Sequence, residues 1–173
     1  MKMADGRVVE LQLRGLTGAV PAEIAQLTSL TKLGLRHNKL TSVPAEIRQL
    51  TSLQELYLGD NQLTGLPAGI EQLTSLEILW LHGNHLASVP AEIWQLTLLR
   101  ELYLHSNHLT GVPAEIAQLT SLEQLDLSDH RLSSVPAEIG QLTSPRELNL
   151  SHNQLRIVPA TTREFSCYVV PSC

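Results

Sequence analysis

Apolar residues recur along this chain at a fixed period of 23, with polar residues at equally regular places between them. Within one period, residues 33–35 alternate apolar and small, the pattern of a short strand with one buried face. A Pro-Ala-Glu-Ile sequence follows at 44–47, and proline suits the first turn of a helical segment. Ile47 and Leu50 lie three residues apart, so both can face inward from that segment. The pattern therefore predicts one short strand and one short helical segment in each period.

The same frame continues through most of the chain. Five leucines open successive units, at Leu30, Leu53, Leu76, Leu99 and Leu122. Pro145 opens the next unit, and the first unit is one residue shorter between Leu13 and Val20. Each unit has an apolar face that only a neighbour covers, so we expect the units to stack into a right-handed solenoid. Strands pack about 4.8 Å apart whereas helical segments need about 8–10 Å, so the stack must curve with its strands inside.

The pattern L-x-x-L-x-L-x-x-N-x-L resembles that of the leucine-rich-repeat family, and the 23-residue units are similar to its Ras-group, or typical, type. The resemblance implies an α/β fold: a curved solenoid with a parallel β-sheet on its concave face and short helical or 3₁₀ segments on its convex face. It covers residues 8–159, with about seven strand-bearing units, of which the first and last are atypical. We expect residues 1–7 to be a disordered lead and residues 160–173 to be a tail that can form a partial cap.

One amide side chain follows the strand in most units. An amide offers two donors and one acceptor, enough to satisfy backbone groups of its own turn and of the adjacent turn. We therefore expect a buried structural ladder of Asn38, Asn61, Asn84, Asn107 and Asn153. His130 replaces the asparagine in one unit, where we expect it to keep one or two of the hydrogen bonds. A functional role for His130 is the alternative.

The outward positions of the strands carry most of the differences between units, so binding information is expected there. Tyr57, Trp80 and Tyr103 occupy the same outward position in three consecutive units, which places them side by side. Tyrosine and tryptophan dominate interface hot spots, and an exposed apolar cluster usually marks a contact site. The alternative is that these rings only stabilise the sheet as cross-strand pairs.

Residues around the three rings are expected to tune the fit of a ligand. Ile78 extends the patch, His82 and His105 border it, and Glu55 with Glu101 gives it an acidic edge suited to a basic group. The predicted ligand-binding set on the concave face is Tyr57, Trp80, Tyr103, Ile78, His82, His105, Glu55, Glu101 and Asp126.

No metal site is predicted from the histidines. His82 and His85 recur one unit later as His105 and His108, but zinc needs three or four convergent ligands at about 2.0–2.3 Å. We expect solvated surface histidines that make binding pH-sensitive near their ordinary pKa of about 6.5. Trp94 stands on the convex side, where we expect it to pack against a neighbouring helical turn, with weak self-association as the alternative.

Composition and charge narrow the classes of function. The chain has 173 residues, a formal net charge of −5 and 34 leucines, which suits one domain with an aliphatic core. Its 12 Lys and Arg are scattered, which argues against nucleic acid as a partner. No apolar run approaches the roughly 18 residues of a membrane span, so we expect no membrane insertion. The start of the chain shows no secretory signal.

The two cysteines, Cys167 and Cys173, bear on the compartment. Extracellular members of the family usually carry cysteine-rich flanking caps, and neither end resembles one, so we expect a cytoplasmic protein. A disulfide between the two cysteines, in a protein secreted by a route that the sequence does not show, is the alternative.

No catalytic arrangement, phosphate loop or cofactor site is evident, so the chain is not expected to be an enzyme and no cofactor is predicted. The predicted function is a protein–protein interaction module that binds a protein or peptide ligand on its concave face. The family resemblance extends this prediction to a scaffold or adaptor in signal transduction. The alternatives are the recognition segment of a larger receptor, kinase or ligase, and a secreted microbial recognition protein.

Overall fold

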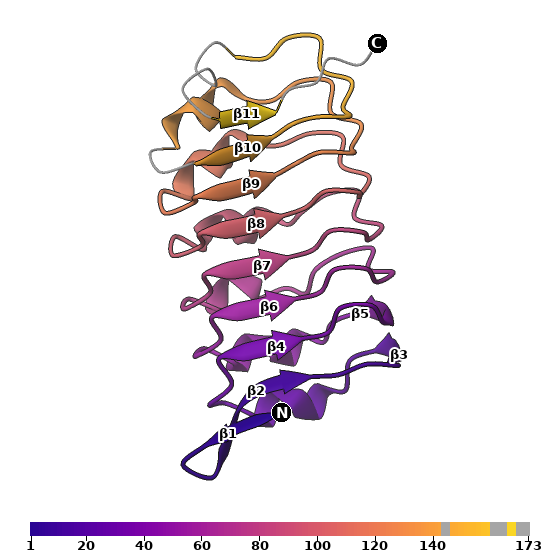
Figure 1. The fold of residues 1–173 in the computed structure, drawn as a ribbon, viewed down its shortest axis with the longest axis vertical. Coiled ribbons are helices and arrows are strands. Elements are labelled where there is room, and N and C mark those ends of the chain that lie inside the picture. Colours follow the sequence, from indigo (N-terminus) through magenta and orange to yellow (C-terminus); the bar gives the residue numbers. More distant parts are fainter. Residues whose placement is uncertain (143–145, 160–165, 169–173) are drawn as a thin grey trace.

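The structure is a computed structural model that describes residues 1–142, 146–159 and 166–168, and it is one stack of strands backed by short helical turns (Figure 1). Nine strands form the main sheet in the order β1-β2-β4-β6-β7-β8-β9-β10-β11. The β1–β2 pair is antiparallel, and every other neighbouring pair is parallel. A small second sheet pairs β3 with β5. The strands are β1 Lys2–Ala4, β2 Arg7–Gln12, β3 Thr17–Ala19, β4 Lys32–Gly34, β5 Lys39–Ser42, β6 Glu55–Tyr57, β7 Ile78–Trp80, β8 Glu101–Tyr103, β9 Gln124–Asp126, β10 Glu147–Asn149 and β11 Ser166–Tyr168.

A layer of 3₁₀ helices lies behind the sheet (Figure 1). Most of them begin directly after a proline whose φ, between −59° and −81°, already suits a helix start. One turn is shortened because Gly69 replaces the usual glutamate and takes a left-handed φ of 86° just before it. The 3₁₀ helices are η1 Ala22–Gln26, η2 Ala45–Gln49, η3 Ile70–Gln72, η4 Ala91–Gln95, η5 Ala114–Gln118 and η6 Ala137–Gln141.

The aliphatic residues of each unit point between the two layers. Leu33, Leu35, Leu40, Ile47 and Leu50 are all fully buried, and the equivalent residues of the next units continue the same core. The predicted α/β solenoid, with a parallel sheet on its concave face and 3₁₀ segments on its convex face, is confirmed. No helix within the described residues is long and apolar enough to cross a membrane.

The buried asparagines join each unit to its neighbours. Asn84 Oδ1 accepts a hydrogen bond from the backbone N–H of Leu63 at 2.9 Å. Its Nδ2 donates to the carbonyl oxygens of Leu58 at 3.0 Å and Leu81 at 2.9 Å. One amide therefore holds the backbone of its own unit and of the preceding one. Equivalent bonds are made by Asn38, Asn61, Asn107 and Asn153.

His130 does not take over the role of the missing asparagine. Its side chain is buried, yet neither ring nitrogen makes a hydrogen bond to any described residue. The predicted one or two bonds are not made with hydrogen-bond geometry, because a rigid ring does not place a donor and an acceptor where the amide places them; burial lowers the pKa of the ring more than the nearby backbone of Asn107 and Leu104 raises it. One unit earlier, the Leu86 N–H donates to Asn107 Oδ1. The equivalent bond, from the Leu109 N–H to the side chain at position 130, is missing.

The two ends of the chain differ in how they meet the sheet. The prediction of a disordered lead at 1–7 is wrong for β1, which pairs antiparallel with β2 and ties Lys2 Nζ to Glu10 at 2.7 Å. At the other end, the backbone of β11 pairs parallel to β10. Pro145, the side chains of the predicted partial cap at 160–173, and the alternative disulfide between Cys167 and Cys173 lie outside the part of the chain that the structure describes.

Trp94 is a core residue. Its side chain is only 1% exposed in η4, and its indole nitrogen has no hydrogen-bond partner among the described residues. The expected packing against a neighbouring turn fits this position, since the equivalent residue of η1, Ala25, is also buried. A buried ring gives no surface for self-association, so the alternative reading of Trp94 is wrong.

Candidate functional site

Three aromatic rings form a continuous row across β6, β7 and β8, on the face of the sheet that points away from the core. Strand pairing sets Tyr57 opposite Trp80 and Trp80 opposite Tyr103. The Tyr57 and Trp80 ring centres lie 4.7 Å apart at 89°, and those of Trp80 and Tyr103 lie 5.3 Å apart at 78°. Both pairs are edge to face, the favoured geometry for neighbouring rings. We call Tyr57, Trp80 and Tyr103 the aromatic row.

The row is half-buried, and its polar ends are already hydrogen-bonded. The Tyr57 hydroxyl donates to Glu55 Oε2 at 2.6 Å, and the Tyr103 hydroxyl donates to Gln124 Oε1. Burial, followed by the Glu55 carboxylate, raises the pKa of Tyr57 to about 12. The tyrosines thus stay neutral at any physiological pH and present fixed ring edges to solvent.

The expected acidic edge is largely used by the protein itself. Lys32 Nζ lies 2.5 Å from Glu55 Oε2, and Trp80 Nε1 donates to Glu101 Oε2 at 3.4 Å. Burial raises the pKa of Glu55, but the hydrogen bonds from Lys32 and Tyr57 outweigh it and hold the pKa below its usual range. Glu55 is therefore charged but internally paired, and it is not the free acidic group that the sequence suggested for a basic ligand.

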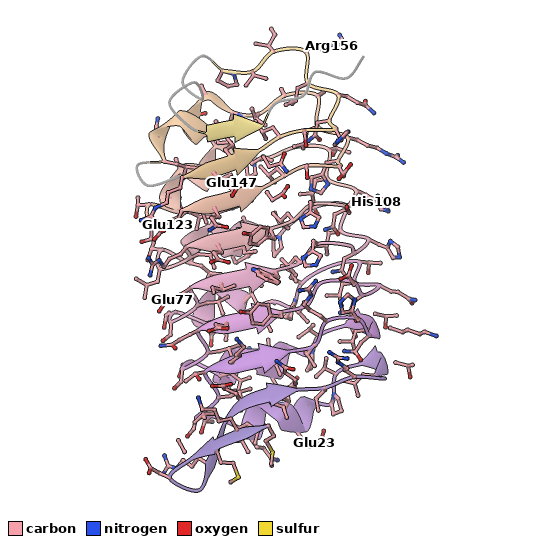
Figure 2. All side chains as sticks on the ribbon, in the orientation of Figure 1. Glu23, Glu77, His108, Glu123, Glu147 and Arg156 are labelled. Carbon is pink, nitrogen blue, oxygen red and sulfur yellow. The ribbon has the colours of Figure 1, made fainter. Side chains whose placement is uncertain are left out.

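His82 is buried, so the prediction of solvated surface histidines is wrong for this residue. Its side chain is 10% exposed and stacks on His105, with ring centres 4.6 Å apart and only 8° between planes. Burial, and then the charges of His105 and Arg36, lower its pKa below the ordinary value. The ring has room because the unit before it carries Gly59 at the equivalent position. His85 and His108 are exposed, as expected, on the turns beyond the strands, where Figure 2 labels His108.

Arg36 links the histidine pair to the aromatic row. Its guanidinium lies 5.0 Å from the centre of the Trp80 ring, within the range of a cation–π contact. Its Nη2 also lies 3.0 Å from His82 Nε2. The same Nε2 lies 3.4 Å from Asp60 Oδ2, so a ring with Nε2 unprotonated accepts from the guanidinium and a ring with Nε2 protonated donates to Asp60.

The end of the concave face nearer the C-terminus is acidic. Asp126 accepts hydrogen bonds from Ser128 and Asn149, and its Oδ2 lies 3.5 Å from His105 Nδ1. Glu147 is exposed on β10, as Figure 2 shows. Burial, and then the charges of Glu101, Glu147 and Asp126, raise the pKa of Tyr103. Ile78, half-buried between Glu55 and Glu101, adds apolar surface beside the row.

The other end of the concave face holds residues that the sequence-based site omitted. A hollow of about 360 Å³ opens there, and its lining includes Arg14, Lys32, Gly34, Arg36 and Trp80. The sequence contains a signal for this cavity. Gly34 leaves a gap in the row of outward side chains between Gln12 and Tyr57, and the cationic residues Arg14, Lys32 and Arg36 occupy neighbouring outward positions. We call this cavity the basic hollow.

No group of three or more His, Cys, Asp or Glu side chains in the described part of the chain is placed to hold a metal ion. The arrangement instead offers rigid aromatic edges flanked by opposite charges, which suits recognition of another molecule by surface contact.

Comparisons with known proteins agree with this geometry. A family model described as a leucine-rich repeat region matches residues 7–102, and a second leucine-rich-repeat model matches residues 97–155. No curated protein matches the chain.

Solved structures with the same fold come from bacteria and plants. A leucine-rich-repeat protein of Leptospira interrogans is 41% identical over 90% of this chain, with a TM-score of 0.82. The plant peptide hormone receptor RGFR1, in complex with RGF2, is 32% identical over 86% of this chain, with a TM-score of 0.77. An internalin of Listeria monocytogenes, 24% identical over 92% of this chain with a TM-score of 0.81, shares the fold.

The chain spans 42%, 25% and 47% of those three proteins, which is less than half the length of each. The repeat pattern, the stacked parallel strands, the amide ladder and the family matches lead to one conclusion. The chain belongs to the leucine-rich-repeat family.

Proposed function

We propose that this chain is a protein-interaction module that holds a protein or peptide ligand on its concave face, with Tyr57, Trp80 and Tyr103 as anchors. The aromatic row carries the proposal. Its rings are held by edge-to-face contacts and by their own hydrogen bonds, so little side-chain entropy is lost when a ligand packs on them. Large rigid aromatic residues are the ones that contribute most to binding at interfaces.

Neighbouring residues contribute shape and charge. Ile78 widens the apolar surface, and the stacked His82 and His105 rings border it. Asp126 and Glu101 supply negative charge beside Tyr103. The plant receptor with a similar solenoid is described in complex with RGF2, which supports a protein-recognition role for this fold.

The biological role of this module is still a prediction. We propose a scaffold or adaptor in signal transduction, in the cytoplasm. The two alternatives are the recognition segment of a larger receptor, kinase or ligase, and a secreted microbial recognition protein. The similarity to a Leptospira protein supports the alternative of a microbial recognition protein. Neither nucleic acid nor an enzymatic substrate is proposed as a partner.

The test is capture of partners from a native lysate, followed by binding measurements with each purified candidate. The variant replaces Tyr57, Trp80 and Tyr103 with alanine. The matched control replaces three exposed residues of the convex turns, Gln26, Gln72 and Gln118, with alanine.

We expect the control chain to bind a purified partner as the original chain does, and the aromatic variant to lose that binding. A chain with Trp80→Ala alone keeps both tyrosines and serves if the triple variant unfolds. Equal binding by all variants would move the interaction away from the concave face and contradict the proposal.

A further inference from the structure

The basic hollow is a gap in an otherwise continuous face. Gly34 has no side chain at the outward position of β4 that pairs with Gln12 on β2 and with Tyr57 on β6. The opening of about 360 Å³ is large enough for a side chain of a ligand, and Tyr57 and Trp80 form its aromatic wall. The hollow therefore adjoins the row that the proposed function uses.

The charges around the hollow leave it positive. Lys32 is paired with Glu55, and Arg36 Nη2 lies 3.5 Å from Asp60 Oδ2. Arg14 is exposed and has no ion pair with any residue that the structure describes. Three cations against two carboxylates leave one net positive charge, which matches one carboxylate better than a phosphate dianion.

The cations of the hollow are also held against the aromatic wall. Lys32 Nζ lies 5.0 Å from the centre of the Tyr57 ring, and the Arg36 guanidinium lies 5.0 Å from that of Trp80. An anion that enters the hollow can therefore contact the cationic side chains, and the group beside it can contact the aromatic rings. The ligand residue that fits is an acidic one with an apolar neighbour.

We propose that the basic hollow receives a carboxylate from an acidic segment of the ligand protein, an inference that rests on the proposed function. The opposite end of the concave face, with Glu101, Asp126 and Glu147, is acidic. The ligand therefore lies across the aromatic row in one direction, with its acidic part over Arg14 and its basic part over Asp126. Charge of opposite sign at the two ends favours this direction and disfavours the reverse.

A displayed library of random linear peptides, selected on the intact chain, tests this inference. Selected peptides are expected to carry Asp or Glu at a fixed distance from an aromatic or aliphatic residue. Arg14→Glu should lower the affinity of such a peptide about tenfold to a hundredfold, the range for one charged hydrogen bond. Arg131→Glu makes the same charge change at an exposed residue outside the hollow and should leave affinity unchanged.

Gly34 offers a second pair of variants that leaves every cation in place. Gly34→Asp puts a carboxylate into the hollow once the exposed Gln12 side chain, whose Cγ lies 2.9 Å from the new Cβ, turns aside, and it should remove the preference for acidic peptides. Gly34→Asn adds a side chain of the same size without charge and should retain part of it. Butyrate, a monocarboxylate, should compete with the selected peptide, whereas competition by inorganic phosphate alone would assign the hollow to phosphate and overturn the inference.

The outcomes separate the two proposals. Peptides that need the aromatic row but show no acidic preference would overturn the role of the hollow and leave the proposed function standing. If no selected peptide depends on the aromatic row, both fail.

Discussion

The His82 ring fills the space that a side chain at Gly59 would occupy: a Cβ atom at position 59 would lie 2.4 Å from His82 Cε1. Real atoms do not approach so closely, so either the ring or the backbone would have to move. The ring has little freedom, because His105 stacks on one side and Arg36 contacts Nε2.

Gly59→Ala is therefore expected to lower the free energy of unfolding by about 1–3 kcal/mol, as overpacking usually does. Urea unfolding followed by circular dichroism measures it. Gly65→Ala is the matched control, since nothing lies within 4 Å of a Cβ there, and it should be neutral. In a His82→Ala background the cost of Gly59→Ala should largely disappear; an unchanged cost would mean that His82 is not what blocks the site.

Asn84→Ala removes one amide of the ladder, which is a partner of four backbone groups, those of Leu58, Leu63, Leu81 and His82. A buried unsatisfied group costs roughly 1–3 kcal/mol, so we expect a loss of at least that size. Thermal and urea unfolding report the loss. Gln62→Ala, at an exposed position, is the control, and a neutral Asn84→Ala would contradict the structural role of the ladder.

His130→Asn should stabilise the protein. It restores an acceptor for the Leu109 N–H and donors for nearby carbonyls, where the buried imidazole makes no hydrogen bond to the described residues. One or two net hydrogen bonds correspond to about 1–2 kcal/mol. His108→Asn, an exposed change of the same kind at a residue without a left-handed backbone, serves as the control. A loss of stability in His130→Asn would show that the ring packs better than the amide bonds.

The buried histidines also predict how stability depends on pH. Burial, first among the causes, holds the pKa of His130 and of His82 below the ordinary value of 6.5. The unfolded chain therefore binds more protons than the folded chain as pH falls through 6.5, and stability drops in that direction. Unfolding midpoints measured between about pH 7 and 5 should decline, and His130→Asn should flatten part of the decline. A parallel decline in both chains would exclude His130 as a source.

Trp80→Ala is expected to cost stability as well as binding, because the ring is half-buried and packs edge to face on two tyrosines. Each such pair contributes about 0.5–1.5 kcal/mol, so the loss should be roughly 1–3 kcal/mol. Trp80→Phe keeps a ring at this position and should lose less. If Trp80→Ala changed binding but not stability, the ring would be less packed than the structure indicates.

Features set by the repeat were predictable from the sequence. The period places Leu33, Asn84 and the aromatic row correctly, because residues 23 apart occupy equivalent positions in neighbouring units. Alternation within a strand then separates inward leucines from outward side chains. The parallel sheet and the 3₁₀ layer follow from the same two periodicities.

Contacts that depend on one residue differing from its equivalents were not predictable. His82 is buried because its neighbour is Gly59, and Glu55 is held in an ion pair because Lys32 precedes it in the stack. Each case concerns a pair of residues in adjacent units, which a pattern common to all units does not describe.

The missing amide bonds at position 130 also bear on how the molecule unfolds. In a stack where each unit touches only its neighbours, cooperativity passes from interface to interface. A weakened interface near His130 lets the final units open without the rest. Amide hydrogen exchange should therefore be faster in the units after His130 than in the units before it. The protein would then behave as one long cooperative block, which includes the aromatic row and the basic hollow, joined to a shorter block that opens first.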